Sequence, residues 1–194
     1  MRDRVDIYKV TASIINKIDG EREYSSGKAI LANLRNSVGK SLSSTVEVWP
    51  LLFENFPDHY LSESGRLTEE EQSVLLALQL YAIHQQGKSQ SVNSRDREDR
   101  FERVIRKLRI GGESQAIDRR FNTLITATEF TEFSHHLRQL IKLLRSKLSD
   151  VKINCPALAE DLYWYQRGYS ENIVLRWGKA YYSSQEDIKE QVND

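Results

Sequence analysis

The 194-residue sequence has little of the material that disulfide-bonded and membrane-spanning architectures need. Its single cysteine, Cys155, excludes an internal disulfide and is typical of proteins from a reducing compartment. No stretch approaches the roughly 18 consecutive apolar residues of a membrane span. The first residues also lack the apolar segment and the small-residue cleavage site of a secretory signal. We therefore expect a cytoplasmic protein that makes no membrane contact.

Residues that interrupt helices are scarce as well. The three prolines are Pro50, Pro57 and Pro156, so long stretches can stay helical without interruption. Leucine, glutamate, glutamine, arginine, lysine and alanine, which favour helices, are plentiful. No segment shows the alternation of polar and apolar residues that a half-buried strand requires, and no fixed-period repeat is present. The sequence predicts an all-α fold.

The helical patterns fall into two groups on either side of a polar segment. Residues 87–100, GKSQSVNSRDREDR, have no apolar face to bury, so we expect weak order there. The prediction is a two-lobed helical bundle protein with an N-terminal lobe in residues 1–90 and a C-terminal lobe with a basic face in residues 91–182. Residues 183–194 form a polar acidic tail that we expect to be disordered.

Two segments show the clearest helical patterns. In residues 68–86, Thr68 can act as the N-cap and Glu71 as its capping-box partner, ahead of a broad apolar stripe. In residues 128–148, Thr128 can cap a helix whose apolar residues step by three and four. Both helices are therefore expected to bury one face in a core.

Aromatic residues gather near the end of the sequence. One interpretation is that Trp164 or Trp177 stacks on unpaired nucleic-acid bases. At helical spacing, however, Tyr165, Trp177 and Tyr181 are better explained as packing of the last helices onto the bundle.

The common catalytic and metal-binding patterns are missing. The stretch SVGKS at residues 37–41 resembles the end of a phosphate-binding P-loop but lacks the first glycine of that pattern. His135 and His136 are adjacent and would point about 100° apart on a helix, so they do not easily chelate one metal. The carboxylates of Glu160 and Asp161 are explained as acids in the first turn of a helix. The sequence therefore predicts no enzyme, no metal site and no cofactor.

The charges balance over the whole sequence but not along it. The chain holds 28 Lys or Arg and 28 Asp or Glu, yet residues 100–147 hold 11 of the former and 5 of the latter. Residues 134–148 contain no acid at all. Cations on the polar backs of three predicted helices are Arg103 and Lys107, Arg119 and Arg120, and Arg138, Lys142 and Arg145. Because acids are missing beside them, the pattern favours a phosphate-binding surface without sequence preference, whose binding weakens steeply with salt.

Five segments then follow one another in a specific order. They are LTEEEQSVLLALQLYAIHQQG, FERVIRKLR, ESQAIDRRFNTLITATEFTEFSHHLRQLIKLLRS, LAEDLYWYQ and VLRWGKAYY. This ordered set resembles the CasB family, the small subunits of the type I-E CRISPR surveillance complex called Cascade. The similarity runs over residues 27–182, and it lies in the ordered set, since no single motif is diagnostic.

The resemblance implies a non-catalytic, all-helical protein that works inside a guide-RNA complex. The implied partners are the guide RNA, the target and non-target DNA strands, the backbone and large subunits of Cascade, and a second copy of the chain. The basic surface would stabilise the hybrid of guide RNA and target DNA and would hold the displaced DNA strand. Base pairing with the guide would supply the sequence recognition.

The family's basic positions carry over to five arginines of this sequence: Arg35, Arg103, Arg119, Arg120 and Arg138. Lys107, Lys142 and Arg145 join them from the helix geometry. The sequence departs from the family where a second arginine often follows Arg35, because Asn36 stands there, and at Gln139 after Arg138.

Two other classes of function remain open at this point. A helical protein-interaction scaffold would use the basic stripe to contact acidic partner surfaces. A stand-alone DNA-binding regulator is compatible with the turn GGES between two predicted helices, as in a helix-turn-helix, but it would prefer one operator over random DNA.

Overall fold

A computed structural model describes residues 6–109, 114–148 and 150–183 of the chain. Within these ranges the fold is all-α, as expected, and the only strand-like pairing is a single parallel bridge between Asn93 and Ile153. The α-helices are α1 (Ile7–Glu21), α2 (Ser25–Asn36), α3 (Trp49–Phe53), α4 (Glu69–Gln85), α5 (Phe101–Arg106), α6 (Ser114–Ile125), α7 (Phe130–Lys147), α8 (Cys155–Trp164) and α9 (Ser170–Tyr182).

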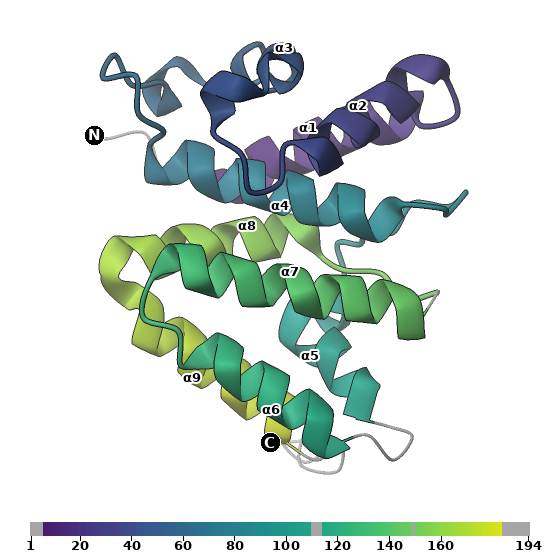
Figure 1. Ribbon diagram of the computed structural model, residues 1–194, viewed down its shortest axis with the longest axis vertical. Coiled ribbons are helices and arrows are strands. Elements are labelled where there is room, and N and C mark those ends of the chain that lie inside the picture. Colours follow the sequence, from purple (N-terminus) through teal and green to yellow (C-terminus); the bar gives the residue numbers. More distant parts are fainter. Residues whose placement is uncertain (1–5, 110–113, 149, 184–194) are drawn as a thin grey trace, which may run out of the picture.

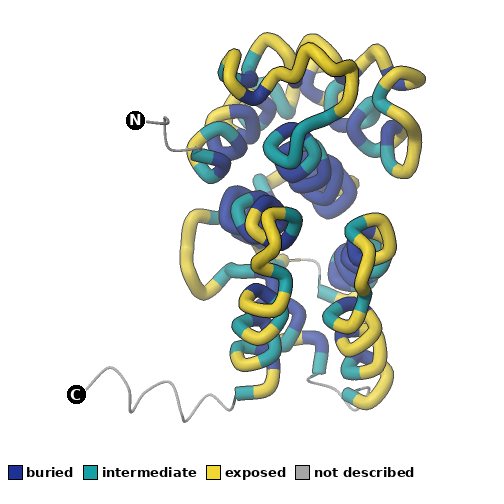
Figure 2. Tube along the Cα trace, turned by 90° about the vertical axis from the view of Figure 1, so that its left-hand side faces the viewer, coloured by how far each residue is buried: buried dark blue, intermediate teal, exposed yellow. Residues whose placement is uncertain are grey.

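The helices are stacked in layers, with α4 near the middle (Figure 1). Helix α4 contacts α1, α2, α7 and α8, while α5, α6 and α9 form the far end of the molecule. Since neighbours surround α4, its buried residues lie on all sides of the helix, which is the pattern of a core helix. Figure 2 shows the buried residues gathered between the layers and the exposed ones along the outer edges. Both α4 and α7 end on the right-hand side of Figure 1.

Helix α4 begins with the expected capping box. The Oγ1 atom of Thr68 accepts a hydrogen bond from the backbone N–H of Glu71 at 3.2 Å. The Glu71 carboxylate in return accepts one from the backbone N–H of Thr68 at 2.7 Å. Helix α7, by contrast, is preceded by Glu129 at the N-cap position with no side-chain cap, so the predicted cap at Thr128 is wrong.

The predicted packing of the C-terminal aromatic residues is confirmed. Trp177 and Tyr181 are fully buried, and the ring of Tyr181 stacks on Phe121 with 3.8 Å between centroids. Phe133 of α7 stacks in the same way on Tyr165, at 4.1 Å. These ring pairs join α6 to α9 and α7 to the segment after α8.

Residues 87–100, expected to be weakly ordered because they lack an apolar face, are attached to the core, so that expectation is wrong. The side chain of Val92 is only 3% exposed. The backbone N–H of Ile153 donates to the Val92 carbonyl at 2.9 Å, and the N–H of Ser94 donates to the Ile153 carbonyl at 3.0 Å. Backbone pairing with a distant segment thus replaces the apolar face that the local sequence lacks.

The halves of the chain share one buried apolar cluster. Helix α8 follows the polar segment in sequence, yet it packs against α1 and α4. Apolar residues from before and after residue 90 belong to the same cluster. The lobe boundaries at residues 90 and 182 stay a prediction, and residues 184–194 of the tail lie outside the described residues.

Candidate nucleic-acid interface

The described ranges contain neither a metal-binding cluster nor a membrane-spanning helix. Over these residues, no three His, Cys, Asp or Glu side chains converge as metal ligands. In the same part of the chain, no helix is both long and apolar enough to cross a bilayer.

The paired carboxylates of Glu160 and Asp161 have a different explanation from the predicted one. They lie in the middle of α8, so their assignment to a first helical turn is wrong. Asp161 is 4% exposed and accepts hydrogen bonds from Arg100 at 2.8 Å, from the Trp177 indole at 2.9 Å and from Arg176. Asp161 therefore ties α8 to α9 and to the residue that precedes α5.

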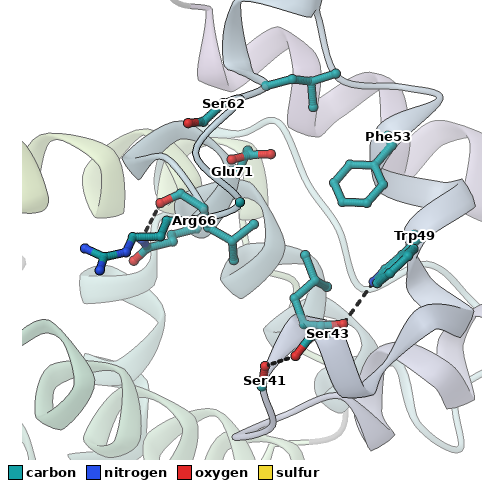
Figure 3. A pocket seen from close by; sticks show the side chains of 12 residues that line it. Ser41, Ser43, Trp49, Phe53, Ser62, Arg66 and Glu71 are labelled. Carbon is teal, nitrogen blue, oxygen red and sulfur yellow. Dashed lines mark hydrogen bonds between the residues drawn. The ribbon is translucent and has the colours of Figure 1, made fainter.

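The pocket shown in Figure 3 lies between the segment around α3 and the start of α4. Its volume is about 630 Å³, and Trp49 and Phe53 form one side while Arg66 and Glu71 lie on the other. The Trp49 indole donates to the Leu42 carbonyl at 2.9 Å. Because Glu71 is engaged in the capping box, the lining residues offer no base beside a nucleophile. The pocket is a mainly apolar depression of the surface.

Three cations from separate segments meet where α4 and α7 end. Arg35 of α2 donates a hydrogen bond to the Ala82 carbonyl of α4 at 3.3 Å. Arg145, in the last turn of α7, donates to the Gln86 side chain just after α4. Lys88 follows two residues later. We call Arg35, Lys88 and Arg145 the cationic junction.

The positive charge of Arg145 acts on both other cations of the junction. Burial lowers the pKa of Arg35, and the positive charge of Arg145 lowers it further. Burial also lowers the pKa of Lys88, while Asp150 raises it and Arg145 lowers it. Because like charges held close together repel, the junction attracts an anion.

Helix α7 extends the positive surface from the junction along its length. Arg138 and Lys142 lie two turns and one turn before Arg145 on the same stripe. Lys142 is exposed, whereas Arg138 is half-buried, and burial lowers the pKa of its guanidinium. Neither side chain pairs with a carboxylate of the described residues. Three of the predicted residues thus line one helix face.

Helix α6 packs against α7 and carries Arg119 and Arg120. Both side chains are exposed, and within the described ranges neither forms an ion pair. The nearby acid Asp118 is occupied, since it accepts hydrogen bonds from Arg109 at 2.9 Å and from the Tyr181 hydroxyl at 2.7 Å. The charges of both arginines are therefore available to a ligand.

The predicted cations of α5 and of the turn that follows it, Arg103 and Lys107, differ, because each faces an acid. Arg103 is only 16% exposed and donates to both carboxylate oxygens of Glu98, at 2.7 and 2.8 Å. The Lys107 ammonium lies 3.9 Å from the carboxylate of Asp99. Both acids belong to the turn Arg97–Asp99, outside the helix, so spacing along α5 could not reveal them.

Sequence reasoning missed Lys88 altogether. It lies in the polar segment that was expected to be weakly ordered, next to Gly87, whose φ of +81° ends α4 with a turn that glycine favours. That glycine was the one local indication that the following side chain would be held in a fixed place.

Comparison with known proteins now adds to this geometry. A sequence model described as CRISPR-associated protein Cse2 matches residues 30–182. The chain belongs to the Cse2 family. All eight predicted site residues and Lys88 fall inside the matched range. A search of curated proteins finds no match to this Cse2 chain.

Solved structures agree with the Cse2 assignment. The crystal structure of CasB from Thermobifida fusca is similar with a TM-score of 0.74 and 22% identity, over 91% of this chain and 98% of that one. A CRISPR-associated protein of the Cse2 family from Thermus thermophilus is similar with a TM-score of 0.65 and 18% identity, over 90% of this chain and 98% of that one. At these identities the likeness shows the fold. The resemblance to the small subunits of type I-E CRISPR systems is thereby confirmed.

Proposed function

We propose that this Cse2 protein is a non-catalytic Cascade subunit that holds nucleic acid without sequence preference. The surface that holds it consists of the cationic junction, the α7 stripe and the exposed arginines of α6. Its ligands are the hybrid of guide RNA and target DNA and the displaced DNA strand. The other partners are the backbone and large subunits and a second copy of the chain.

The convergence of Arg35, Lys88 and Arg145 from three segments carries this proposal. Like charges placed close together destabilise the folded protein, because each disfavours the charged form of its neighbours. A polyanion removes that cost by accepting charge-assisted hydrogen bonds. Phosphates are also spaced regularly along a strand, so the α7 stripe can continue the contacts.

Non-specific binding follows from the kind of residue involved. Arginine and lysine bound to phosphates release counterions and fix the path of the strand, but they do not read bases. In an RNA-guided complex, the guide supplies the sequence recognition and the protein supplies a charged channel. A surface that offers cations to phosphates, but within the described residues no helix for contacting base edges, suits the protein's part in such a complex.

The test is DNA retention by the assembled complex as a function of salt. The variant Arg119→Gln, Arg120→Gln, Lys142→Gln removes three exposed charges without touching the core. Each lost phosphate contact is expected to lower the slope of log affinity against log salt by about 0.7 to 0.9. The total affinity at low salt should fall by roughly 10- to 100-fold.

The matched control removes the same total charge elsewhere. Lys17→Gln, Arg66→Gln, Lys179→Gln changes three exposed cations that lie outside the proposed surface. DNA retention of this control is expected to stay within about twofold of the parent. If both triple variants lost affinity equally, only net charge would matter and the assignment of the surface would be wrong.

A protein-interaction scaffold is the second candidate, favoured by the exposed side chains of Trp49, Phe53 and Leu61 beside the pocket of Figure 3. A gel shift of the isolated chain with unrelated DNA at low salt separates the two candidates. A weak, salt-sensitive shift supports nucleic-acid binding. Binding to one operator alone would instead indicate a stand-alone regulator.

A further inference from the structure

The side chain of Lys88 is partly buried, and its ammonium forms no hydrogen bond within the described residues. Its Nζ atom is inaccessible to solvent. An ammonium shielded from solvent without a hydrogen bond destabilises the folded state, and a bound anion is one way to satisfy it. The nearby Asp150 influences the charge of Lys88, yet it does not reach Nζ with a hydrogen bond.

The segment around Lys88 is held firmly by polar contacts. The backbone N–H of Lys88 donates to the Gln85 carbonyl at 3.0 Å. The Gln85 side chain donates back to the carbonyls of Lys88 and Gln90, each at 2.9 Å. The Arg22 guanidinium donates to the Ser89 carbonyl at 3.0 Å. The backbone around Lys88 is therefore fixed before any ligand arrives, so binding needs only a rotation of the flexible lysine side chain to bring Nζ to the ligand.

A pocket of about 320 Å³ opens between this segment and α2. The charged residues that line it are Arg22, Glu23, Lys28, Arg35 and Lys88, four cations and one acid. Arg22 is partly neutralised by Asp19 at 2.8 Å. Lys28, Arg35 and Lys88 remain for a ligand, and Arg145 adds its charge from the α7 side, as its effect on Arg35 and Lys88 shows.

We propose that this pocket binds one phosphate group, with Lys88 and Arg35 as its hydrogen-bond donors and Lys28 at its rim. A tetrahedral phosphate accepts hydrogen bonds from several directions at once, which suits donors that come from α2 and from the segment after α4. A planar carboxylate suits a single guanidinium fork instead. The pocket adjoins the α7 stripe, so the phosphate belongs to a nucleic-acid backbone whose next phosphates reach Arg145 and Lys142. That source of the phosphate rests on the proposed function, whereas the phosphate chemistry does not.

The first experiment concerns the isolated full chain with inorganic phosphate. Because phosphate binds the folded state, it should raise the melting temperature above that in chloride of equal ionic strength. Lys88→Gln, which removes the charge and keeps a polar side chain of similar length, should lose that increase, and Lys88→Arg should retain it. Lys17→Gln, an exposed lysine of α1, should behave as the parent. An equal phosphate effect in Lys88→Gln and the parent would overturn the site.

The second experiment identifies the source of the phosphate in the assembled complex. Target and non-target strands are prepared with one uncharged methylphosphonate linkage, moved along the strand one position at a time. In the parent complex, one linkage should lower affinity about 5- to 10-fold, as loss of one phosphate contact does. Lys88→Gln should lower the affinity for unmodified DNA by a similar factor. In this variant, the methylphosphonate linkage at that position should cause no further loss of affinity. Persistence of the linkage effect in Lys88→Gln would contradict the proposal.

The two experiments separate the possible failures. One result is that phosphate raises the melting temperature of the isolated chain, while Lys88→Gln abolishes the effect of no linkage in the complex. That result would support the pocket and refute nucleic acid as its ligand. Loss of DNA binding in the surface triple variant with an unaltered Lys88→Gln variant would support the proposed function and refute the pocket. Polyglutamate is tested beside phosphate in the first experiment. If it raised the melting temperature more than phosphate does, the pocket would be assigned to an acidic protein segment and the proposal would be overturned.

Discussion

Arg145 donates a hydrogen bond to Gln86, which joins the last turn of α7 to the first residue after α4. The contact bridges residues 59 positions apart in the sequence and lies two residues before Lys88. Since the guanidinium gains no charge partner from an amide, the link orients Arg145 while leaving its positive charge available. The junction is thus held in place by neutral hydrogen bonds.

The first prediction separates orientation from charge at this link. Gln86→Leu removes the acceptor, so Arg145 should lose its fixed position and DNA affinity of the complex should fall by about two- to threefold. The salt slope should stay the same, because no phosphate contact is lost. Arg145→Gln should lower both the affinity and the slope, the latter by about 0.7 to 0.9. A changed slope in Gln86→Leu would contradict this role.

The second prediction concerns the ion pair of Arg103 and Glu98. Glu98→Gln frees the guanidinium from its carboxylate partner, so DNA affinity should rise by about two- to threefold at low salt. Arg103→Gln should change the affinity less than Arg119→Gln, whose charge has no partner within the described residues. The measurement is DNA binding by the complex at two salt concentrations. An affinity loss in Arg103→Gln as large as in Arg119→Gln would show that Glu98 does not shield it.

The fold was largely predictable because its patterns are local. The apolar stripe of α7 and the capping box of Thr68 and Glu71 are set by residues three and four apart, a distance that sequence reasoning covers. The burial of Val92 was not predictable, since it depends on backbone pairing with Ile153, more than fifty residues later. The first-turn assignment of Asp161 failed because α8 already begins at Cys155, with Asn154 as its N-cap, and the contacts of Asp161 with Arg100 and Trp177 form only in the folded chain.

The site was predictable to the extent that it follows helix faces. Arg138, Lys142 and Arg145 share a stripe that can be read from their spacing. The encounter of Arg35 with that stripe depends on how α2 packs on α4, which spacing along either helix does not determine. Lys88 was missed because a charged residue in a polar segment is ordinarily solvated, and here the Gly87 turn brings its ammonium inward instead.

The third prediction tests the buried acceptor at Asp161. Asp161→Asn keeps the shape of the side chain but leaves Arg100 and Arg176 with Glu102 as their acidic partner. The free energy of unfolding should fall by about 2 kcal/mol, below the range for a fully buried broken pair, because the Arg176 side chain is 40% exposed. Urea unfolding measures the difference. The neighbour Glu160→Gln, which breaks no such contact, should stay within about 0.5 kcal/mol of the parent, and equal losses would refute the role of Asp161.

The last prediction concerns the acid sensitivity that buried His84 confers. Burial lowers the pKa of His84 from 6.5 to about 4; the Val151 carbonyl opposes this shift, and Lys88 and Arg145 add to it. Below pH 6.5 the unfolded chain therefore binds a proton that the folded chain excludes, so stability falls as the pH decreases toward 4. The contribution is about 1.4 kcal/mol per pH unit in that window. His84→Gln keeps a donor for the Val151 carbonyl at 2.9 Å and removes the titration, so its free energy of unfolding should decline less steeply between pH 6.5 and 4. Parallel pH profiles of the free energy of unfolding for the parent and the variant would show that His84 has the same pKa in the folded and the unfolded chain, which would contradict the prediction.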